Sequence, residues 1–264
     1  MEGSVMILKA DLLSQIFSGM ALIGRILCKR FFELLPKENR VVLTLQYTNE
    51  LRDSLGHCTR FLKSFHHLEL SLQLNSGENS ICRLPKGELD NFIRQTSTLT
   101  SLDIRKNGLG RWGGGSESLF DLLVSTPQLR KLHAGDNELG PTGALHLAMG
   151  ILYTPLLISL DLSHDKLGDD GMTNLVPGLC STILLTEVSL CRNGISAAGA
   201  AQLAKAMAHL TLLKSLNIAE NILGSAGALQ LAVGLIRASQ ITSLRLGWNG
   251  IGAAGAASFL HPHE

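Results

Sequence analysis

"NIAENILGSAGALQLA" runs from Asn217 to Ala232, and "RLGWNGIGAAGAASFL", from Arg245 to Leu260, repeats its pattern 28 residues later. Both stretches place an Asn before a hydrophobic residue and a glycine, and then a run of small residues. Self-similarity at a fixed period of about 20–50 residues is typical of solenoids, propellers and other repeat arrays. The repeat therefore decides the fold class, and further copies of it occur along the chain.

An L-x-x-L-x-L-x-x-N pattern recurs along the chain, and its last position aligns the copies. That position is occupied by Asn75, Asn107, Asn137, Asp165, Asn193, Asn221 and Asn249. The intervals between them, taken from the C-terminus backwards, are 28, 28, 28, 28, 30 and 32 residues. A weaker copy, "VVLTLQYT", ends at Thr48. We predict seven repeats, or eight with this weaker copy.

The L-x-L core of each repeat alternates with period two, which predicts a short strand whose leucines share one face. Leu216 with Ile218 is an example. The Asn position needs a side chain that hydrogen-bonds to the backbone where the chain leaves the strand. Asp165 keeps an acceptor there but loses two donors, so we expect a looser turn in its repeat.

Helical spacing follows the Asn in each repeat. Small residues such as Gly199 and Gly227 are predicted to open helices that approach the strand layer closely, and the last helix is predicted to begin at Gly255. Pro177 falls inside one of these helices, which we expect to kink or end early. One repeat cannot cover its own apolar face, so neighbouring repeats must stack.

On these motifs, residues from about 65 to 264 resemble the leucine-rich repeats of the ribonuclease-inhibitor type, which also occur in NOD-like receptor arrays and in the GTPase-activating protein of Ran. The resemblance implies an α/β solenoid, a horseshoe with a parallel sheet on its concave side and helices on its convex side. We assign residues 40–264 to this domain. No polar cap follows the last repeat, so we expect either that a partner covers it or that the chain is a truncated form.

Residues 1–39 lack regular repeats and are predicted to be helical. "LLSQIF" (Leu12–Phe17), followed by "CKRFFEL" (Cys28–Leu34), resembles the two ends of an F-box, a module that docks a ubiquitin-ligase scaffold. The interval between them is shorter than in that motif, and the Leu-Pro opening of the motif is missing. The alternative is a helical cap over the open edge of the first strand.

Composition narrows the function classes. The 23 Lys and Arg residues nearly balance 22 Asp and Glu residues, which argues against a nucleic-acid or anionic-membrane surface. The longest uncharged run near the N-terminus, Leu12–Gly24, is too short to span a bilayer. The five cysteines are far apart and include no Cys-x-x-Cys pair, which is typical of reduced thiols. We predict a cytoplasmic or nuclear protein without a membrane span.

No motif predicts catalysis, a cofactor, a metal or a small-molecule substrate. "GRWGGGS" (Gly110–Ser116) lacks the Gly-Lys-Ser/Thr of a phosphate-binding loop. The tail residues His261, His263 and Glu264 lack the organised surroundings that a metal site needs. We predict that Cys180 packs in the interior, and that Cys191 faces outward on its strand.

Residues between the core leucines are predicted to face outward, and most of them are small and polar. Trp and Arg dominate the energetics of protein interfaces. The predicted partner-binding residues are Arg105, Lys131, His164, Arg192, Glu220, Arg245 and Trp248. Trp248, Arg245 and Arg192 form the central cluster of this prediction; the alternative is that Trp248 packs on its neighbouring loop.

The sequence thus predicts a non-enzymatic module that binds a protein partner through the concave face and the strand-exit loops. Two alternatives are an F-box-like substrate adaptor of a ubiquitin ligase, and a regulator of the NOD-like-receptor or GTPase-activating type. The sequence does not identify the partner.

Overall fold

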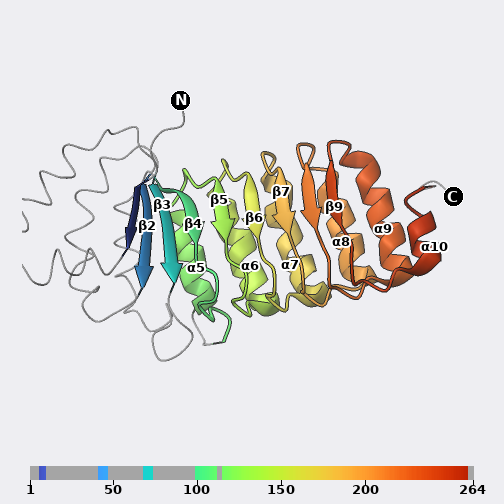
Figure 1. The fold of residues 1–264 in the computed structure, drawn as a ribbon, viewed down its shortest axis with the longest axis horizontal. Helices are drawn as coiled ribbons and strands as arrows, with labels where there is room; N and C mark the ends of the chain where they lie inside the picture. The colour runs from blue at the N-terminus through green and yellow to red at the C-terminus, as the bar shows by residue number, and fades with distance from the viewer. Residues whose placement is uncertain (1–5, 10–40, 47–67, 74–98, 112–114, 261–264) are drawn as a thin grey trace, which may run out of the picture.

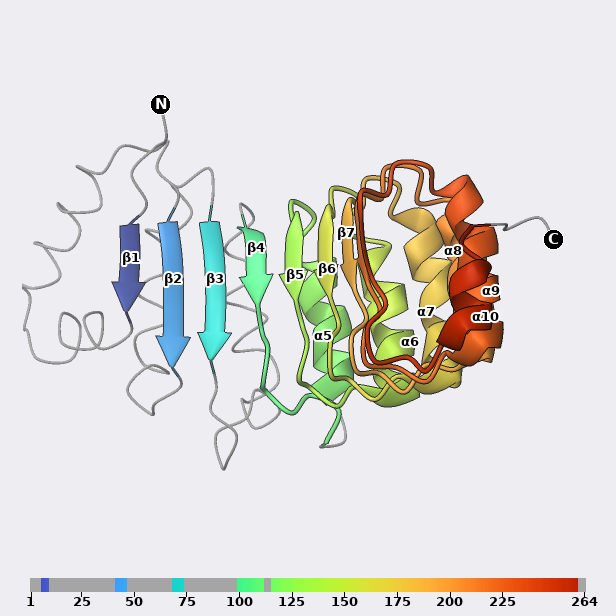
Figure 2. The ribbon, with the colours of Figure 1, turned by 45° about the vertical axis from the view of Figure 1, so that its right-hand side comes forward.

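The computed structural model describes residues 6–9, 41–46, 68–73, 99–111 and 115–260. The described strands form one nine-stranded parallel sheet in the order of the sequence, β1 to β9. The helices lie on one side of this sheet, so that the chain alternates between a strand layer and a helix layer (Figures 1 and 2). A parallel sheet built from successive repeats is the predicted solenoid.

Each strand pairs with the strand of the neighbouring repeats, and from β5 to β9 the register advances by the 28-residue period. Leu216, for example, lies between Val188 and Leu244. The strands are β1 (Met6–Lys9), β2 (Val41–Gln46), β3 (Leu68–Gln73), β4 (Leu99–Asp103), β5 (Lys131–His133), β6 (Ser159–Asp161), β7 (Glu187–Ser189), β8 (Ser215–Asn217) and β9 (Ser243–Arg245).

The N-terminal end of the sheet extends further than the sequence predicted. β2 falls on the weak copy that ends at Thr48, which confirms a strand there. β1 pairs with β2 in parallel, although no strand was predicted at residues 6–9. The two F-box-like pieces, Leu12–Phe17 and Cys28–Leu34, lie outside the described residues. The division into residues 1–39 and 40–264 therefore stays a prediction.

The helices are α5 (Gly115–Val124), α6 (Gly140–Ile151), α7 (Gly168–Ser181), α8 (Ala197–Met207), α9 (Gly224–Arg237) and α10 (Gly252–Ala257). α10 begins three residues before the predicted Gly255, because Gly252, with φ of +60°, makes the turn from loop to helix. α7 contains Pro177 but continues to Ser181, so the expectation of an early end was wrong. The side chain of Pro177 is exposed on the helix surface.

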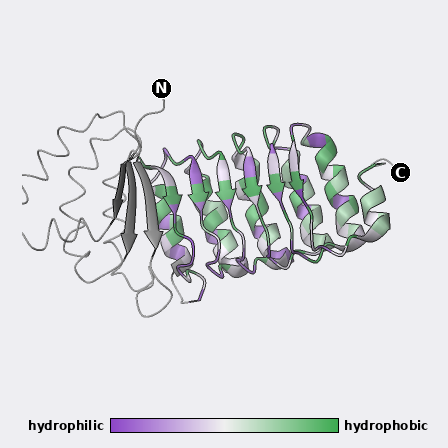
Figure 3. Ribbon diagram, in the orientation of Figure 1, coloured by the Kyte–Doolittle hydropathy of each residue, from purple (hydrophilic) through white to green (hydrophobic). Residues whose placement is uncertain are grey.

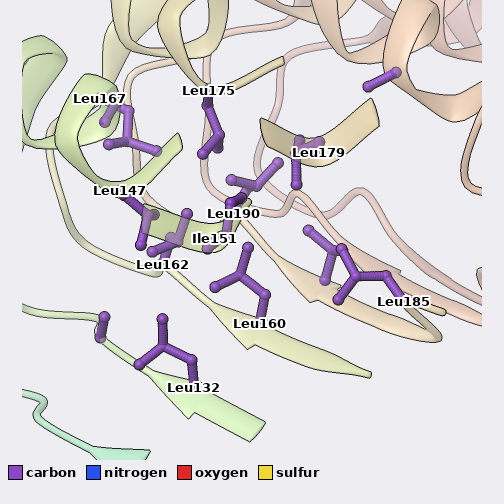
Figure 4. Packing of buried hydrophobic residues seen from close by; sticks show 14 of the residues in the cluster. Leu132, Leu147, Ile151, Leu160, Leu162, Leu167, Leu175, Leu179, Leu185 and Leu190 are labelled. Atoms are coloured by element: carbon purple, nitrogen blue, oxygen red, sulfur yellow. The ribbon is translucent and has the colours of Figure 1, made fainter. Parts of the chain in front are cut away.

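Leucines from both layers fill the space between them. Leu132, Leu160 and Leu190, from three neighbouring repeats, are fully or almost fully buried. They belong to the same buried cluster as the leucines of α6 and α7, such as Leu147 and Leu175, and Figure 4 shows them on the strand side of that cluster. Hydrophobic residues recur at the same level of successive strands (Figure 3), as period-two alternation requires.

The glycines in the helices allow neighbouring helices to pack closely against each other, and they do not face the sheet. A Cβ atom on Gly178 would lie 2.8 Å from the carbonyl oxygen of Ala148 in α6. One on Gly234 would lie 2.9 Å from the Cα atom of Ala204 in α8.

The two glycines of the prediction, Gly199 and Gly227, behave alike: a Cβ atom on them would lie 3.4 Å from the Cα atom of Asp169 in α7 and 3.3 Å from the Cα atom of Ala197 in α8, respectively. The predicted approach to the strand layer is therefore corrected, because these glycines let successive helices stack at the spacing that the sheet imposes.

Buried amide side chains at the strand exits connect each repeat to the next. The backbone N–H of Asn193 donates to Oδ1 of Asn221 (2.9 Å), and the N–H of Asn221 donates to Oδ1 of Asn249 (3.2 Å). Nδ2 of Asn221 donates to the carbonyl oxygens of Ile218 in its own repeat and Leu190 in the preceding one, both at 3.0 Å. This Asn ladder confirms the predicted role of the Asn position.

The ladder continues through Asp165. Oδ1 of Asp165 accepts from the N–H of Asn137 (2.8 Å), and its own N–H donates to Oδ1 of Asn193 (3.0 Å). The expected loosening of this turn is therefore wrong for the ladder contacts, because an Asp oxygen accepts as well as an Asn oxygen does.

We predict that Asn221→Ala lowers the free energy of unfolding by about 3–5 kcal/mol, because it leaves two buried N–H groups and two carbonyl groups without partners. Urea denaturation followed by circular dichroism measures this change. Asn174→Ala is the matched control, since its side chain makes one exposed hydrogen bond, to the carbonyl of Pro141. Similar losses in both variants would contradict the role of the ladder.

Candidate protein-binding surface

The outward-facing side chains of β4 to β9, together with the residues just before each ladder position, form one surface, which we call the sheet face. Its centre is a row of hydrogen bonds that crosses three strands. Nδ2 of Asn217 donates to Oγ of Ser189 (3.1 Å), which lies 2.8 Å from Oγ of Ser163. Oγ of Ser163 donates to Oδ1 of Asp161 (2.7 Å). This row fixes the polar side chains in one arrangement.

The row ends at a carboxylate that is ionised at neutral pH. Burial opposes ionisation of Asp161, but contacts to His133 and Ser163 outweigh it and lower the pKa to about 2. Nδ1 of His133 lies 3.9 Å from Oδ2, which is too long for a hydrogen bond, so its contribution is electrostatic. The two hydrogen bonds from Ser163, from Oγ and from the backbone N–H, hold the carboxylate in place.

Four of the seven predicted partner-binding residues make ion pairs or close charge contacts within the sheet face. Arg105 donates to both carboxylate oxygens of Asp103, at 2.9 and 2.6 Å. Arg192 and Glu220, on neighbouring strand exits, form an ion pair. Nδ1 of His164 lies 3.5 Å from a carboxylate oxygen of Asp136. A partner that used these charges would have to compete with existing contacts.

The other three predicted residues are exposed, and their side chains have no hydrogen-bond or ion-pair partner in the described part of the chain. These are Lys131, Arg245 and Trp248. Lys131 in β5 stands four strands from Arg245 in β9, which corresponds to roughly 19 Å at the usual spacing of strands. Trp248 follows Arg245 at the exit of the same strand. The structure therefore places two of the three together.

The backbone holds the strand-exit side chains in a left-handed conformation. The residue before each ladder position has φ between 55° and 63°: Lys106, Asp136, His164, Arg192, Glu220 and Trp248. A bulky side chain in this region is uncommon and strained. Trp248 is nonetheless 88% exposed, so the alternative in which it packs on its neighbouring loop was wrong.

Sequence reasoning missed one exposed residue beside Trp248. Ile222 follows the ladder residue Asn221 on the neighbouring strand exit and is 66% exposed. The signal was available, because this position is occupied by Gly or a charged residue in the other repeats from Asn107 to Asn249. An exposed Ile and an exposed Trp on adjacent exits place the most apolar part of the strand exits at the C-terminal end of the sheet face.

Burial raises the pKa of the thiols of both described cysteines. Cys180 packs against the core and is partly buried, close to the prediction. Cys191 faces the sheet side, and its Sγ lies 3.9 Å from a carboxylate oxygen of Glu220. Burial and this carboxylate raise the pKa of the Cys191 thiol, which reduces the thiolate fraction that nucleophilic chemistry requires.

Among the described residues, no three His, Cys, Asp or Glu side chains are grouped closely enough for a metal ion. Across the described ranges, no helix has the length and apolarity needed to cross a membrane. The tail residues His261, His263 and Glu264, and residues 112–114 of the glycine-rich loop, lie outside the described residues.

Asp165 has the most perturbed carboxyl group near this surface. Burial raises its pKa to about 8, although the N–H groups of Asn137 and Leu139 act in the opposite direction, and the nearby carboxylates of Asp161 and Asp136 raise it further. Its Oδ2 atom is buried and has no hydrogen-bond partner. In the other ladder positions Nδ2 occupies this place and donates to backbone carbonyls, as in Asn193 to Leu162 (2.7 Å).

Comparisons with known proteins agree with this geometry. Residues 240–260 match the model of the Leucine Rich repeat family. The structure resembles the leucine-rich repeat-containing protein LegL7 from Legionella pneumophila, with 17% identity, a TM-score of 0.51, and coverage of 98% of this chain and 89% of that one. The chain has the fold of a leucine-rich-repeat solenoid.

A second solved structure similar to this solenoid is the internalin InlF from Listeria monocytogenes, with 16% identity and a TM-score of 0.44. That match covers 86% of this chain and 64% of the internalin. No curated protein matches the chain in sequence. The ribonuclease-inhibitor subtype of the repeats stays a prediction from their 28-residue period.

We predict that Asp165→Asn stabilises the protein in a pH-dependent way. The folded-state pKa of about 8 lies above the value of about 3.9 for an unfolded chain. The stability of the native protein therefore falls as pH rises from about 4 to about 8. We expect the variant to gain about 3–5 kcal/mol at pH 8 and less than about 1 kcal/mol at pH 4.

Urea denaturation of both proteins at the two pH values measures this difference. Asp170→Asn is the control, because it makes the same chemical change at an exposed carboxyl group on α7. A gain from Asp165→Asn that is equal at pH 4 and pH 8 would show that the carboxyl group is not protonated in the folded protein.

Proposed function

We propose that this chain is a non-enzymatic protein-interaction module that binds a protein partner through the sheet face and its strand exits. The observation that carries the proposal is Trp248, which is 88% exposed although its backbone is held at φ of 60°. A strained and solvated Trp has no role in the stability of the solenoid itself. Trp is enriched among the residues that dominate binding at protein interfaces.

The rest of the sheet face supports the same function. Its central side chains are already fixed by hydrogen bonds from Asn217 through to Asp161, so binding would lose little side-chain entropy. Opposite charges alternate along the strand exits, as in Arg192 with Glu220. A mixed, preorganised polar surface with one aromatic anchor fits the surface of a folded protein, whereas a nucleic-acid backbone requires a continuous basic surface.

Affinity purification of the tagged full-length protein from cells, followed by quantitative mass spectrometry, tests the proposal. We expect Trp248→Ala and Lys131→Glu to lower the recovery of the same partner by about tenfold or more, since each removes an exposed group of the sheet face. The matched controls are Ile183→Ala, which truncates a residue that is 60% exposed after α7, and Lys205→Glu on α8. Lys205 lies in the helix layer, and Ile183 lies in the turn between α7 and β7, at the entry of its strand and not at a strand exit.

Two results would contradict the proposal. Either both sheet-face variants recover every partner, or the control variants lose the partner to the same extent as the sheet-face variants.

The same purification with a chain that lacks residues 1–35 addresses the F-box-like prediction. Loss of ligase scaffold proteins in that chain alone would favour the adaptor function. A regulator of the Ran-activator type would require stimulation of GTP hydrolysis, a separate assay.

A further inference from the structure

We propose that two copies of this chain associate through the outward side chains of α5 to α8, with α6 of each copy against α7 of the other. This inference goes beyond the proposed function, because it concerns the opposite layer of the solenoid. The helices lie on one side of the sheet, and the sheet face lies on the other (Figures 1 and 2). Such a dimer would leave the sheet faces of both copies open to partners.

α6 presents an apolar surface to solvent. Its exposed residues follow one stripe at i, i+4 and i+7: Leu145, Met149 and Leu152. Tyr153, which is 51% exposed, continues the stripe and contacts Phe120 of α5 edge to face, with ring centroids 6.1 Å apart. Residues 139–160 include no Asp, Glu, Lys or Arg. An uncharged apolar stripe of this extent is typical of a surface that another protein surface covers.

The 28-residue period gives the neighbouring helices an equivalent of Met149. The equivalents are Asp121 in α5, Pro177 in α7 and Lys205 in α8. The backbone N–H groups of Thr126 and Thr154 close the ends of α5 and α6 in the same way, each by bonding three residues back, so the period holds there. At this level the surface is therefore acidic on α5, apolar on α6 and α7, and basic on α8.

The charges of Asp121 and Lys205 are not compensated within the described part of the chain. The Asp121 side chain forms no hydrogen bond or ion pair there, and Nζ of Lys205 donates only to the neutral Oε1 of Gln202 (3.1 Å). A two-fold axis parallel to the helices, midway between α6 and α7, would place Asp121 of each copy opposite Lys205 of the other. Two opposite-charge pairs would then flank the apolar contact.

The curvature of the solenoid favours a contact centred on α6 and α7. Neighbouring strands lie about 4.8 Å apart, whereas packed helices lie about 8–10 Å apart. Because each repeat contributes one strand and one helix, the helix layer is the longer one and curves outward. Two such surfaces approach most closely at the axis, where Met149 would lie against Pro177 of the second copy. The long side chain of Lys205 suits the wider gap on either side.

Other two-fold arrangements of this surface are less favourable. An axis perpendicular to the helices would place α5 against itself, with Asp121 facing Asp121, and like charges oppose this contact. An axis between α7 and α8 would place α6 on α9, whose outward residue Val233 is also apolar. That arrangement puts Lys205 against Pro177 at the centre, where the ammonium group would lose water without gaining a partner.

Sedimentation velocity of the full-length protein at micromolar concentrations tests the charge pairs. We expect the wild-type chain to dimerise. Asp121→Lys and Lys205→Glu should each raise the dissociation constant about tenfold or more, because each variant places two like-charge pairs in the dimer. An equimolar mixture of the two variants should dimerise like the wild-type chain, since both pairs then join opposite charges.

Met149→Glu tests the apolar contact and should abolish the dimer at the same concentrations, because it buries a carboxylate there. Val233→Glu is the matched control and should leave the dimer unchanged. Val233 has the same position in its repeat as Met149, and the two residues are 47% and 46% exposed. Matching circular dichroism spectra of the variants would show that each one is folded.

Three results would overturn the inference: a wild-type chain that stays monomeric, a mixture of charge variants that fails to dimerise, or equal effects of Met149→Glu and Val233→Glu. The proposed function is tested separately. Trp248→Ala and Lys131→Glu change the sheet face and should leave the dimer intact, whereas Lys205→Glu should lose the dimer and retain the sheet-face partner.

Discussion

Each repeat from β4 to β9 depends on one buried side chain at its strand exit. The amide of Asn221 accepts from the backbone of the preceding repeat and donates to carbonyl groups of both repeats. Leucine burial contributes most of the stabilisation, but it is non-directional and does not set the register of the strands. The amide ladder does, because each bond forms only when neighbouring repeats are aligned. Without it, backbone groups would be buried without partners.

The sequence predicted most of this architecture, because the requirements are local. Alternation in "LKSLNIAEN" places Leu216 and Ile218 inward, and only Asn offers a donor and an acceptor that fit the exit. The start of α10 was misplaced because Gly252 and Gly255 are both small, and sequence alone does not show which of them takes a positive φ. The strand at residues 6–9 lies outside the recognisable period.

The candidate surface was less predictable. Period two indicates that Arg105 and Arg245 both face outward, but the pairing of Arg105 with Asp103 depends on side-chain conformation. The distances between the seven predicted partner-binding residues, which lie on six strands, depend on how the whole sheet is assembled. The left-handed backbone at the exits was also unpredictable, since Glu220 and Trp248 give none of the signal that Gly or Asn would give.

The unpartnered oxygen of Asp165 has a mechanical consequence. At the other described ladder positions from Asn137 to Asn249, Nδ2 forms a bond back to the preceding repeat, as Asn193 does to Leu162 and Asn249 to Ile218. Asp165 makes no such bond, so the junction between β5 and β6 is held by fewer hydrogen bonds than its neighbours. The helices of the same two repeats, α6 and α7, pack more extensively than any other pair of described helices. At this junction the helix layer therefore carries more of the cohesion between neighbouring repeats than it does elsewhere in the solenoid.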